Sequence, residues 1–177
     1  MFFSNTGVIV EMKNFQLENL NNVSFEKDNN FFSLFINKSE EYYTGEMHWS
    51  SSFKLGKLDI VHFLIVDNKA VLFTSSVQNF LTFQKIIEHI SPDADVHLLK
   101  LPLPVPKKEV NSSEIRKIEI DEYFGLTVIL DINKENLLTK IYTNGIVTFS
   151  MLVNTPLEEV IRLMKLIINI IEEFHEK

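Results

Sequence analysis

The sequence contains no cysteine among its 177 residues. This absence excludes a disulfide framework, thiolate chemistry and a zinc site built from cysteine ligands. No apolar run is long enough to span a bilayer. The first residues, MFFSNTGVIVEMK, have neither the basic segment nor the long apolar core of a secretory signal. We therefore expect an intracellular protein of the cytoplasm or nucleus, which is not secreted and has no membrane partner.

Basic residues are also scarce. Lys and Arg total 17 against 24 Asp and Glu, which gives a net charge of -7 and a pI of about 5.2. The longest basic run is the pair Lys107-Lys108. Non-specific binding of nucleic acid depends on a basic face that neutralises phosphates. The composition therefore argues against a broad DNA-coating surface, but it is compatible with a local basic or apolar binding face.

Sequence signatures of catalysis are absent as well. None of the motifs G-x-S-x-G, H-E-x-x-H, G-x-x-x-x-G-K-[ST] or G-x-G-x-x-G occurs. The five histidines are scattered, and the adjacent pair Asp121-Glu122 would point to opposite faces of a strand. His89 and His175 fall near predicted helix C-termini, where the helix dipole favours a positively charged side chain. Their positions therefore have a structural explanation. We expect no catalytic residue, no metal site and no cofactor.

Phenylalanine is abundant instead, with 15 residues against one Trp and four Tyr. Short runs of aromatic and β-branched residues predict strands. These runs cover residues 7–15, 31–36, 42–49, 61–66, 70–74, 95–103, 125–132, 137–142 and 146–153. Apolar residues at helical spacing predict helices from about residue 75 to 90 and at 155–173, and short helices near 17–20 and within 111–120. The pattern predicts an α+β fold.

The helix predicted at 155–173 carries an unusually wide apolar face. Residues spaced by three and four positions form its central stripe: Leu157, Val160, Met164, Ile167, Ile171 and Phe174. Four further residues widen that stripe: Leu163, Leu166, Ile168 and Ile170. A helix of this kind is either covered on two sides or meets a partner with part of its apolar face.

The order strand, turn, strand, helix occurs twice, at 64–90 and at 140–171. With an offset of 76 positions, Asn68 falls on Asn144 and Phe73 falls on Phe149. Such a match predicts an internal duplication. We expect a first repeat at 1–92 and a second at 93–177, joined in one continuous structural domain.

One stretch of the second half resembles a known family. Residues 122–126 (EYFGL) and 140–150 (KIYTNGIVTFS) are similar to two motifs of the TATA-box-binding proteins, and the gap between them is nearly that family's gap. The resemblance implies a saddle. Two pseudo-symmetric repeats form one curved antiparallel β-sheet with two long helices packed on its convex face.

The resemblance also implies a function, which is minor-groove binding of AT-rich duplex DNA in a transcription context, by aromatic wedges on the concave face. Phe124 and Tyr142 stand at the wedge positions of the second repeat. Carried over position by position, the nucleic-acid-binding residues would be Phe31, Phe32, Val66, Val71, Thr74, Phe124, Tyr142, Val147 and Ser150.

The chain departs from that family at positions that matter for DNA. The family has a Lys after the hairpin Gly, where this chain has Ile146, and Ala70 in the first half. Val66 is not aromatic. A second interpretation is therefore a protein–protein interaction module, such as an inhibitor, immunity or adaptor protein. It would use the same saddle, or the wide apolar face of helix 155–173, without binding DNA.

Overall fold

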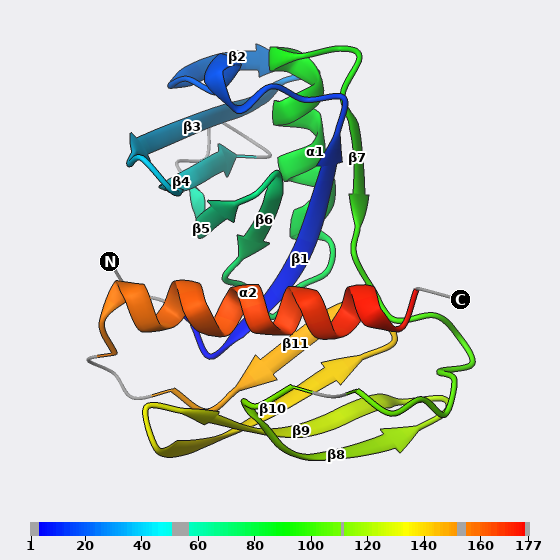
Figure 1. Ribbon diagram of the computed structural model, residues 1–177. Coiled ribbons are helices and arrows are strands. Elements are labelled where there is room, and N and C mark those ends of the chain that lie inside the picture. Colours follow the sequence, from blue (N-terminus) through cyan, green and yellow to red (C-terminus); the bar gives the residue numbers. More distant parts are fainter. Residues whose placement is uncertain (1–3, 51–56, 111, 152–154, 176–177) are drawn as a thin grey trace.

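The computed structural model describes residues 4–50, 57–110, 112–151 and 155–175. Within these residues, 11 strands form one antiparallel sheet that is accompanied by two α-helices (Figure 1). The strands are β1 (Thr6–Lys13), β2 (Val23–Lys27), β3 (Asn30–Lys38), β4 (Tyr43–Ser50), β5 (Asp59–Val66), β6 (Lys69–Leu72), β7 (Asp95–Leu98), β8 (Ile115–Asp121), β9 (Gly125–Ile132), β10 (Glu135–Tyr142) and β11 (Ile146–Phe149). The helical segments are the 3-10 turn η1 (Leu17–Asn19), α1 (Asn79–Ile90) and α2 (Leu157–Glu173). The predicted α+β class and the large antiparallel sheet are confirmed.

The sheet is centred on β1. The strand order is β2-β3-β4-β5-β6-β1-β11-β10-β9-β8, and β7 pairs with β1 off this path. Residues 8–11 of β1 pair with β6, residues 6–8 with β11 and residues 10–13 with β7. Because the β6 pairing overlaps both of the others, β11 and β7 share the opposite edge of β1. The first strand of the chain therefore joins its two halves.

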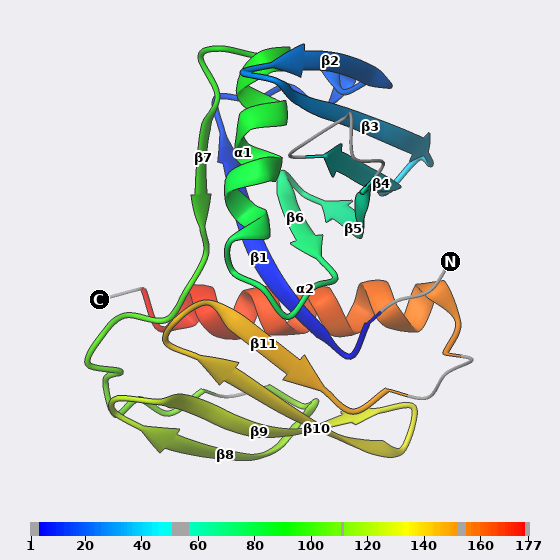
Figure 2. The same cartoon turned by 180° about the vertical axis from the view of Figure 1, so that it is seen from behind.

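The two helices lie on opposite faces of the central strands. Successive residues of a strand point to opposite faces. Val8 and Val10 of β1 pack with Phe83 of α1, whereas Ile9 packs with Ile167 of α2. In Figure 1 α2 lies in front of the sheet, and in Figure 2 α1 does. This arrangement differs from the predicted one, in which both helices would lie on a single convex face.

The wide apolar face of α2 is covered inside the molecule. Its buried residues are Val160, Leu163, Met164, Ile167, Ile168, Ile170 and Ile171. They share one core cluster with residues of β1, β5 and β6 and with residues of β9, β10 and β11. The exposed residues between 158 and 173 form a narrow polar stripe of Glu158, Arg162, Asn169 and Glu173. The apolar face of helix 155–173 was predicted as a possible docking surface for a partner. That prediction is wrong, because the face is buried inside the molecule.

Hairpin turns fix the register of the strands. Three turns place two consecutive residues at positive φ, as two-residue hairpins require: Asp28-Asn29, Asp67-Asn68 and Asn133-Lys134. The Asn144-Gly145 turn is different, because it has positive φ only at Gly145. It is a three-residue loop, because Ile141 pairs with Val147 beyond it.

The segment from 111 to 120 was predicted to hold a short helix, and this is wrong. Residues 115–121 form β8, with an irregularity between Ile115 and Lys117. The extra residue there separates Ile115 from Ile118 by three positions and so imitates helical spacing. Strand β2 was not predicted. The end of the strand predicted at 146–153 falls partly on residues 152–154, which lie outside the described residues.

Candidate interaction site

Three of the residues proposed for DNA contact lie in the core. Val66, Val71 and Val147 are at most 3 % exposed and pack in the cluster that surrounds α2. Their strands present these side chains to the helix and not to an open concave face. The prediction that these three valines lie on an exposed binding surface is therefore wrong, because all three are buried against α2.

The first-half candidates do not form a common surface either. Phe32 is buried against the α1 side of the sheet, and Phe31, its neighbour, points to the other face. Thr74 is buried in the segment between β6 and α1. Its Oγ1 accepts hydrogen bonds from the Ser76 amide at 3.1 Å and from Asn79 Nδ2 at 2.7 Å. These bonds give Thr74 a local structural role.

Two of the second-half candidates lie close together. Phe124 is exposed, and the next residue, Gly125, pairs with the partly exposed Tyr142. Ser150 lies at the other end of β10, where its Oγ accepts a hydrogen bond from the Leu138 amide at 2.9 Å. The structure therefore brings together Phe124 and Tyr142 and leaves Ser150 remote from them.

The β8–β9 turn carries the most exposed large apolar side chains among the described residues. Tyr123 and Phe124 are 68 % and 73 % exposed, and Leu103 in the preceding loop is 66 % exposed. The amide of Val105 donates to the carbonyl of Glu122 at 2.8 Å, which holds this loop beside the turn. We call Leu103, Tyr123 and Phe124 the aromatic tip.

The turn that presents the two aromatic residues is tightly hydrogen-bonded. Asp121 Oδ1 accepts from the amides of Tyr123 at 2.9 Å and Phe124 at 3.0 Å. These two bonds, with Tyr123 the larger contributor, hold the pKa of Asp121 below its ordinary value. Thr143 donates its hydroxyl to the Tyr123 carbonyl at 2.9 Å and its amide to the Phe124 carbonyl at 3.1 Å. The aromatic tip is therefore preorganised.

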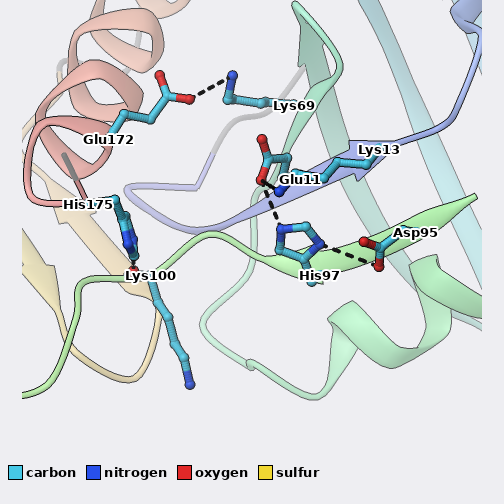
Figure 3. A network of polar contacts seen from close by, with 8 residues as sticks. All are labelled: Glu11, Lys13, Lys69, Asp95, His97, Lys100, Glu172 and His175. Atoms are coloured by element: carbon cyan, nitrogen blue, oxygen red, sulfur yellow. Dashed lines mark hydrogen bonds and ion pairs between the residues drawn. The ribbon is translucent and has the colours of Figure 1, made fainter. Parts of the chain in front are cut away.

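A polar network lies where β1 and β7 meet the end of α2 (Figure 3). His97 on β7 is directly opposite Glu11 on β1, and its Nε2 lies 2.8 Å from Glu11 Oε2. The other ring nitrogen of His97 faces Asp95 at 3.6 Å, and Lys13 Nζ lies 3.4 Å from Glu11. Burial opposes ionisation of Glu11. The His97 hydrogen bond and Lys13 outweigh it, so the pKa of Glu11 is lowered.

The C-terminal end of α2 borders the same region. Lys69 of β6 pairs with Glu172 at 2.9 Å, and His175 Nε2 donates to the Lys100 carbonyl at 2.7 Å. Together these elements enclose a groove of about 620 Å³. Its lining residues are Glu11, Lys13, His97, Leu98, Leu99, Lys100, Glu172 and His175. These lining residues are mainly charged groups and imidazoles and include no hydroxyl nucleophile, which suits binding better than acyl transfer.

The Glu11–His97 contact should make stability depend on pH. The folded-state pKa of Glu11 is depressed, so its carboxylate stabilises the fold above its unfolded-state pKa. This contribution disappears as pH falls through the folded-state value. We expect Glu11→Gln to lower the free energy of unfolding by about 1 kcal/mol at pH 7 and to have little effect near pH 3.

Urea denaturation of the wild type and Glu11→Gln at both pH values checks this expectation. Glu26→Gln, on the exposed side of β2, is the matched control and should be neutral at both pH values. An equal loss for Glu11→Gln at pH 3 and at pH 7 would show that its effect does not come from ionisation.

A second polar group occupies the face of β3–β5 that α1 does not cover. Glu46 lies between two histidines, with Oε2 at 2.9 Å from His48 Nε2 and Oε1 at 3.4 Å from His62 Nδ1. Phe35, nearly half exposed, packs its ring on His48. Among the described residues, no group of three or more His, Cys, Asp or Glu side chains is suited to hold a metal ion. The carboxylate and the two imidazoles are best explained by their mutual contacts.

Sequence reasoning missed most of these features. Tyr123 and Leu103 were not proposed as site residues, although Asp121 two residues before Tyr123 is a signal of a side-chain-stabilised turn. The Glu11–His97 contact joins residues 86 positions apart. It depends on the register of β1 with β7, which the composition of the two segments does not determine.

Comparison with known proteins gives no relative: no family model, no curated protein and no solved structure matches this chain. In the part of the chain that the structure describes, neither helix is long and apolar enough to cross a membrane.

Proposed function

We propose that this chain is a non-enzymatic, intracellular protein-binding module, and that the aromatic tip is its contact surface. The observation that carries the proposal is the pair of adjacent aromatic side chains, 68 % and 73 % exposed, on a turn fixed by hydrogen bonds. Tyrosine and other large aromatic residues are enriched among the residues that dominate binding energy at protein interfaces.

Preorganisation strengthens this proposal. A flexible loop loses conformational freedom when it binds, and that loss reduces affinity. Asp121 and Thr143 already hold the backbone of Tyr123 and Phe124 in the unbound protein. A partner that buries the two rings therefore gains apolar contact area at a small entropic cost.

The charges around the tip favour a protein partner over nucleic acid. Asp121 and Glu122 directly precede the two aromatic residues in the sequence, and Lys107 is paired with Glu122 at 3.0 Å. A phosphate backbone approaching the tip would meet these carboxylates. An interface with apolar and hydrogen-bonding groups of another protein would not need an excess of positive charge.

Capture from an extract of the source cells tests the proposal. Wild type, Phe124→Ser, Tyr123→Ser and Leu138→Ser are immobilised at equal density, and captured proteins are quantified by mass spectrometry. We expect at least one protein whose capture falls roughly tenfold or more in both tip variants. Leu138 is 44 % exposed on β10 and serves as the matched apolar control, which should retain capture. If no captured protein depends on Tyr123 or Phe124, the tip is not the contact surface.

AT-rich duplex DNA is the second candidate ligand, in the transcription context that the family resemblance implies. The observation that favours it is the proximity of Phe124 and Tyr142, the two wedge residues of the second half. Fluorescence anisotropy with a labelled AT-rich duplex, at low and moderate salt, tests this candidate. DNA binding that weakens steeply with salt and is lost in Phe124→Ala and Tyr142→Ala would favour DNA over the protein partner.

We also propose that the two halves arose by duplication. β6 and β11 lie on either side of β1, and each is followed by a long helix. Ala70 packs in the core cluster that contains α1, and Val147 packs in the cluster that contains α2. In each half, the strand after the hairpin turns one face toward the helix that follows it. Ala70 and Val147 hold these matching positions and are 77 positions apart, whereas the sequence alignment of the hairpins gives an offset of 76.

A further inference from the structure

Strand β7 has one paired edge and one open edge. Leu99, just after it, donates its amide to the Ile9 carbonyl at 2.9 Å, and His97 is opposite Glu11 in the same register. Backbone groups alternate in direction along a strand. His97 and Leu99 therefore face β1, whereas Val96 and Leu98 direct their amides and carbonyls away from it.

No other described strand lies beyond that edge. Figures 1 and 2 both show β7 at the periphery of the molecule, and its pairing is with β1 alone. β11, which shares this edge of β1, is followed by β10, β9 and β8. The sheet therefore continues outward beside β11 and stops beside β7, which leaves one strand position vacant next to Val96 and Leu98.

The other two edge strands are protected against pairing. β8 combines an irregularity with the charged residues Arg116, Lys117 and Glu119. β2 carries exposed charged residues in its second half. Bulges and edge charges of this kind discourage the addition of another strand. β7 has a regular register with β1 and contains neither lysine nor proline. Its outward backbone groups belong to the apolar residues Val96 and Leu98.

The groove described above lies beside β7, on the face of the sheet that carries the end of α2. Leu98 and Leu99 are its apolar lining residues. The Glu11 carboxylate is already paired with His97 and Lys13, as Figure 3 shows. The Lys100 ammonium points away from the other side chains drawn there and makes no ion pair with any of them. An acidic side chain on a bound segment would complement Lys100.

We propose that the open edge of β7 binds an extended segment of a protein partner as an added strand, with an acidic side chain of that segment beside Lys100. The amides and carbonyls of Val96 and Leu98 make the main-chain hydrogen bonds. Leu98, which is only partly buried, contacts an apolar side chain of the segment. This inference rests on the proposed function in one respect, which is that the partner is a protein. The binding residues are different, because none of them belongs to the aromatic tip.

Substitutions at Leu98 test the backbone hydrogen bonds directly. Leu98→Pro removes the outward amide but no bond to β1, and proline is compatible with an edge position in a strand. Leu98→Ala is the matched control, since it removes the side chain and keeps the amide. The probe is a library of random linear peptides displayed on phage, selected against the wild-type chain and then measured as synthetic peptides.

We expect the selected peptides to bind Leu98→Pro at least about tenfold more weakly than Leu98→Ala. Their acidic members should bind Lys100→Gln more weakly than the wild type and lose that difference at high salt. In the wild type, peptide binding should slow hydrogen exchange of the Val96 and Leu98 amides. This last measurement keeps the test independent of any effect of proline on folding.

Two results would overturn the inference. One is equal affinity for Leu98→Pro and Leu98→Ala, and the other is unchanged exchange at Val96 and Leu98 in the saturated complex. Phe124→Ser is measured with the same peptides to separate the two surfaces. Peptides that depend on Phe124 and not on the Leu98 amide would support the aromatic tip and refute strand addition at β7, whereas the reverse pattern would support strand addition alone.

Discussion

Replacing Ile167 by alanine is expected to lower the free energy of unfolding by about 2–5 kcal/mol. Ile167 is fully buried at the middle of α2, in the cluster that joins β1, β5 and β6 to β9, β10 and β11. Removing three carbon atoms there takes away apolar burial and leaves a cavity between elements that cannot move together without breaking strand pairs.

Urea denaturation followed by two signals checks this prediction. Fluorescence of Trp49, the single tryptophan, reports on β4 in the first half, and far-UV circular dichroism reports on the whole chain. Because α2 packs on both halves, we expect both signals to shift together to lower urea. Asn169→Ala, on the exposed stripe of α2, should change stability by no more than about 0.5 kcal/mol. Separate transitions would show that α2 does not couple the halves.

Replacing Gly125 by alanine should be at least as damaging, with a loss of about 3–5 kcal/mol. Gly125 has a φ of +129°, which side chains with a Cβ rarely adopt. A Cβ at this position would lie 2.0 Å from the Ile141 carbonyl oxygen. The substitution would therefore break the pairing of β9 with β10 at the base of the aromatic tip.

Gly145→Ala separates the two causes of that loss. Gly145 also has a positive φ of +91°, but the nearest atom to an added Cβ is 3.6 Å away. Its substitution should cost only the backbone strain of about 1–2 kcal/mol. Thermal or urea unfolding of both variants measures the difference. A similar loss in the two would mean that β9 and β10 shift apart easily and that steric contact at Gly125 is unimportant.

The strands with simple patterns were predictable from sequence, and the arrangement of the helices was not. Residues 125–132 were predicted as a strand and form β9 with the same bounds, because the segment is rich in β-branched and aliphatic residues. The continuous apolar run from Phe63 to Val66 was a signal that β5 is buried on both faces. A strand that is buried on both faces does not fit a saddle whose concave face is exposed. The saddle was nevertheless predicted, because that prediction followed the family resemblance.

The candidate site was predictable in part. Phe124 and Tyr142 were identified from a local motif, and the structure places them at neighbouring strand ends. The burial of Val66, Val71 and Val147 was missed, because it depends on which face of the sheet α2 covers. The groove beside β7 is formed by residues of β1, β7 and the end of α2. These segments are far apart in the sequence, so no pattern within any one of them predicts the groove.

The central position of β1 has a consequence for how the chain folds during synthesis. β1 leaves the ribosome before its partners, and the last of them, β11, follows only after most of the chain has been made. The three pairings of β1 join segments that are distant in the sequence, and contacts of this kind slow folding. Until β11 has been synthesised, the edge of β1 at residues 6–8 that pairs with β11 has no partner strand. The growing chain therefore carries an unfinished sheet edge until its last strand is made, and such an edge is open to pairing with other chains.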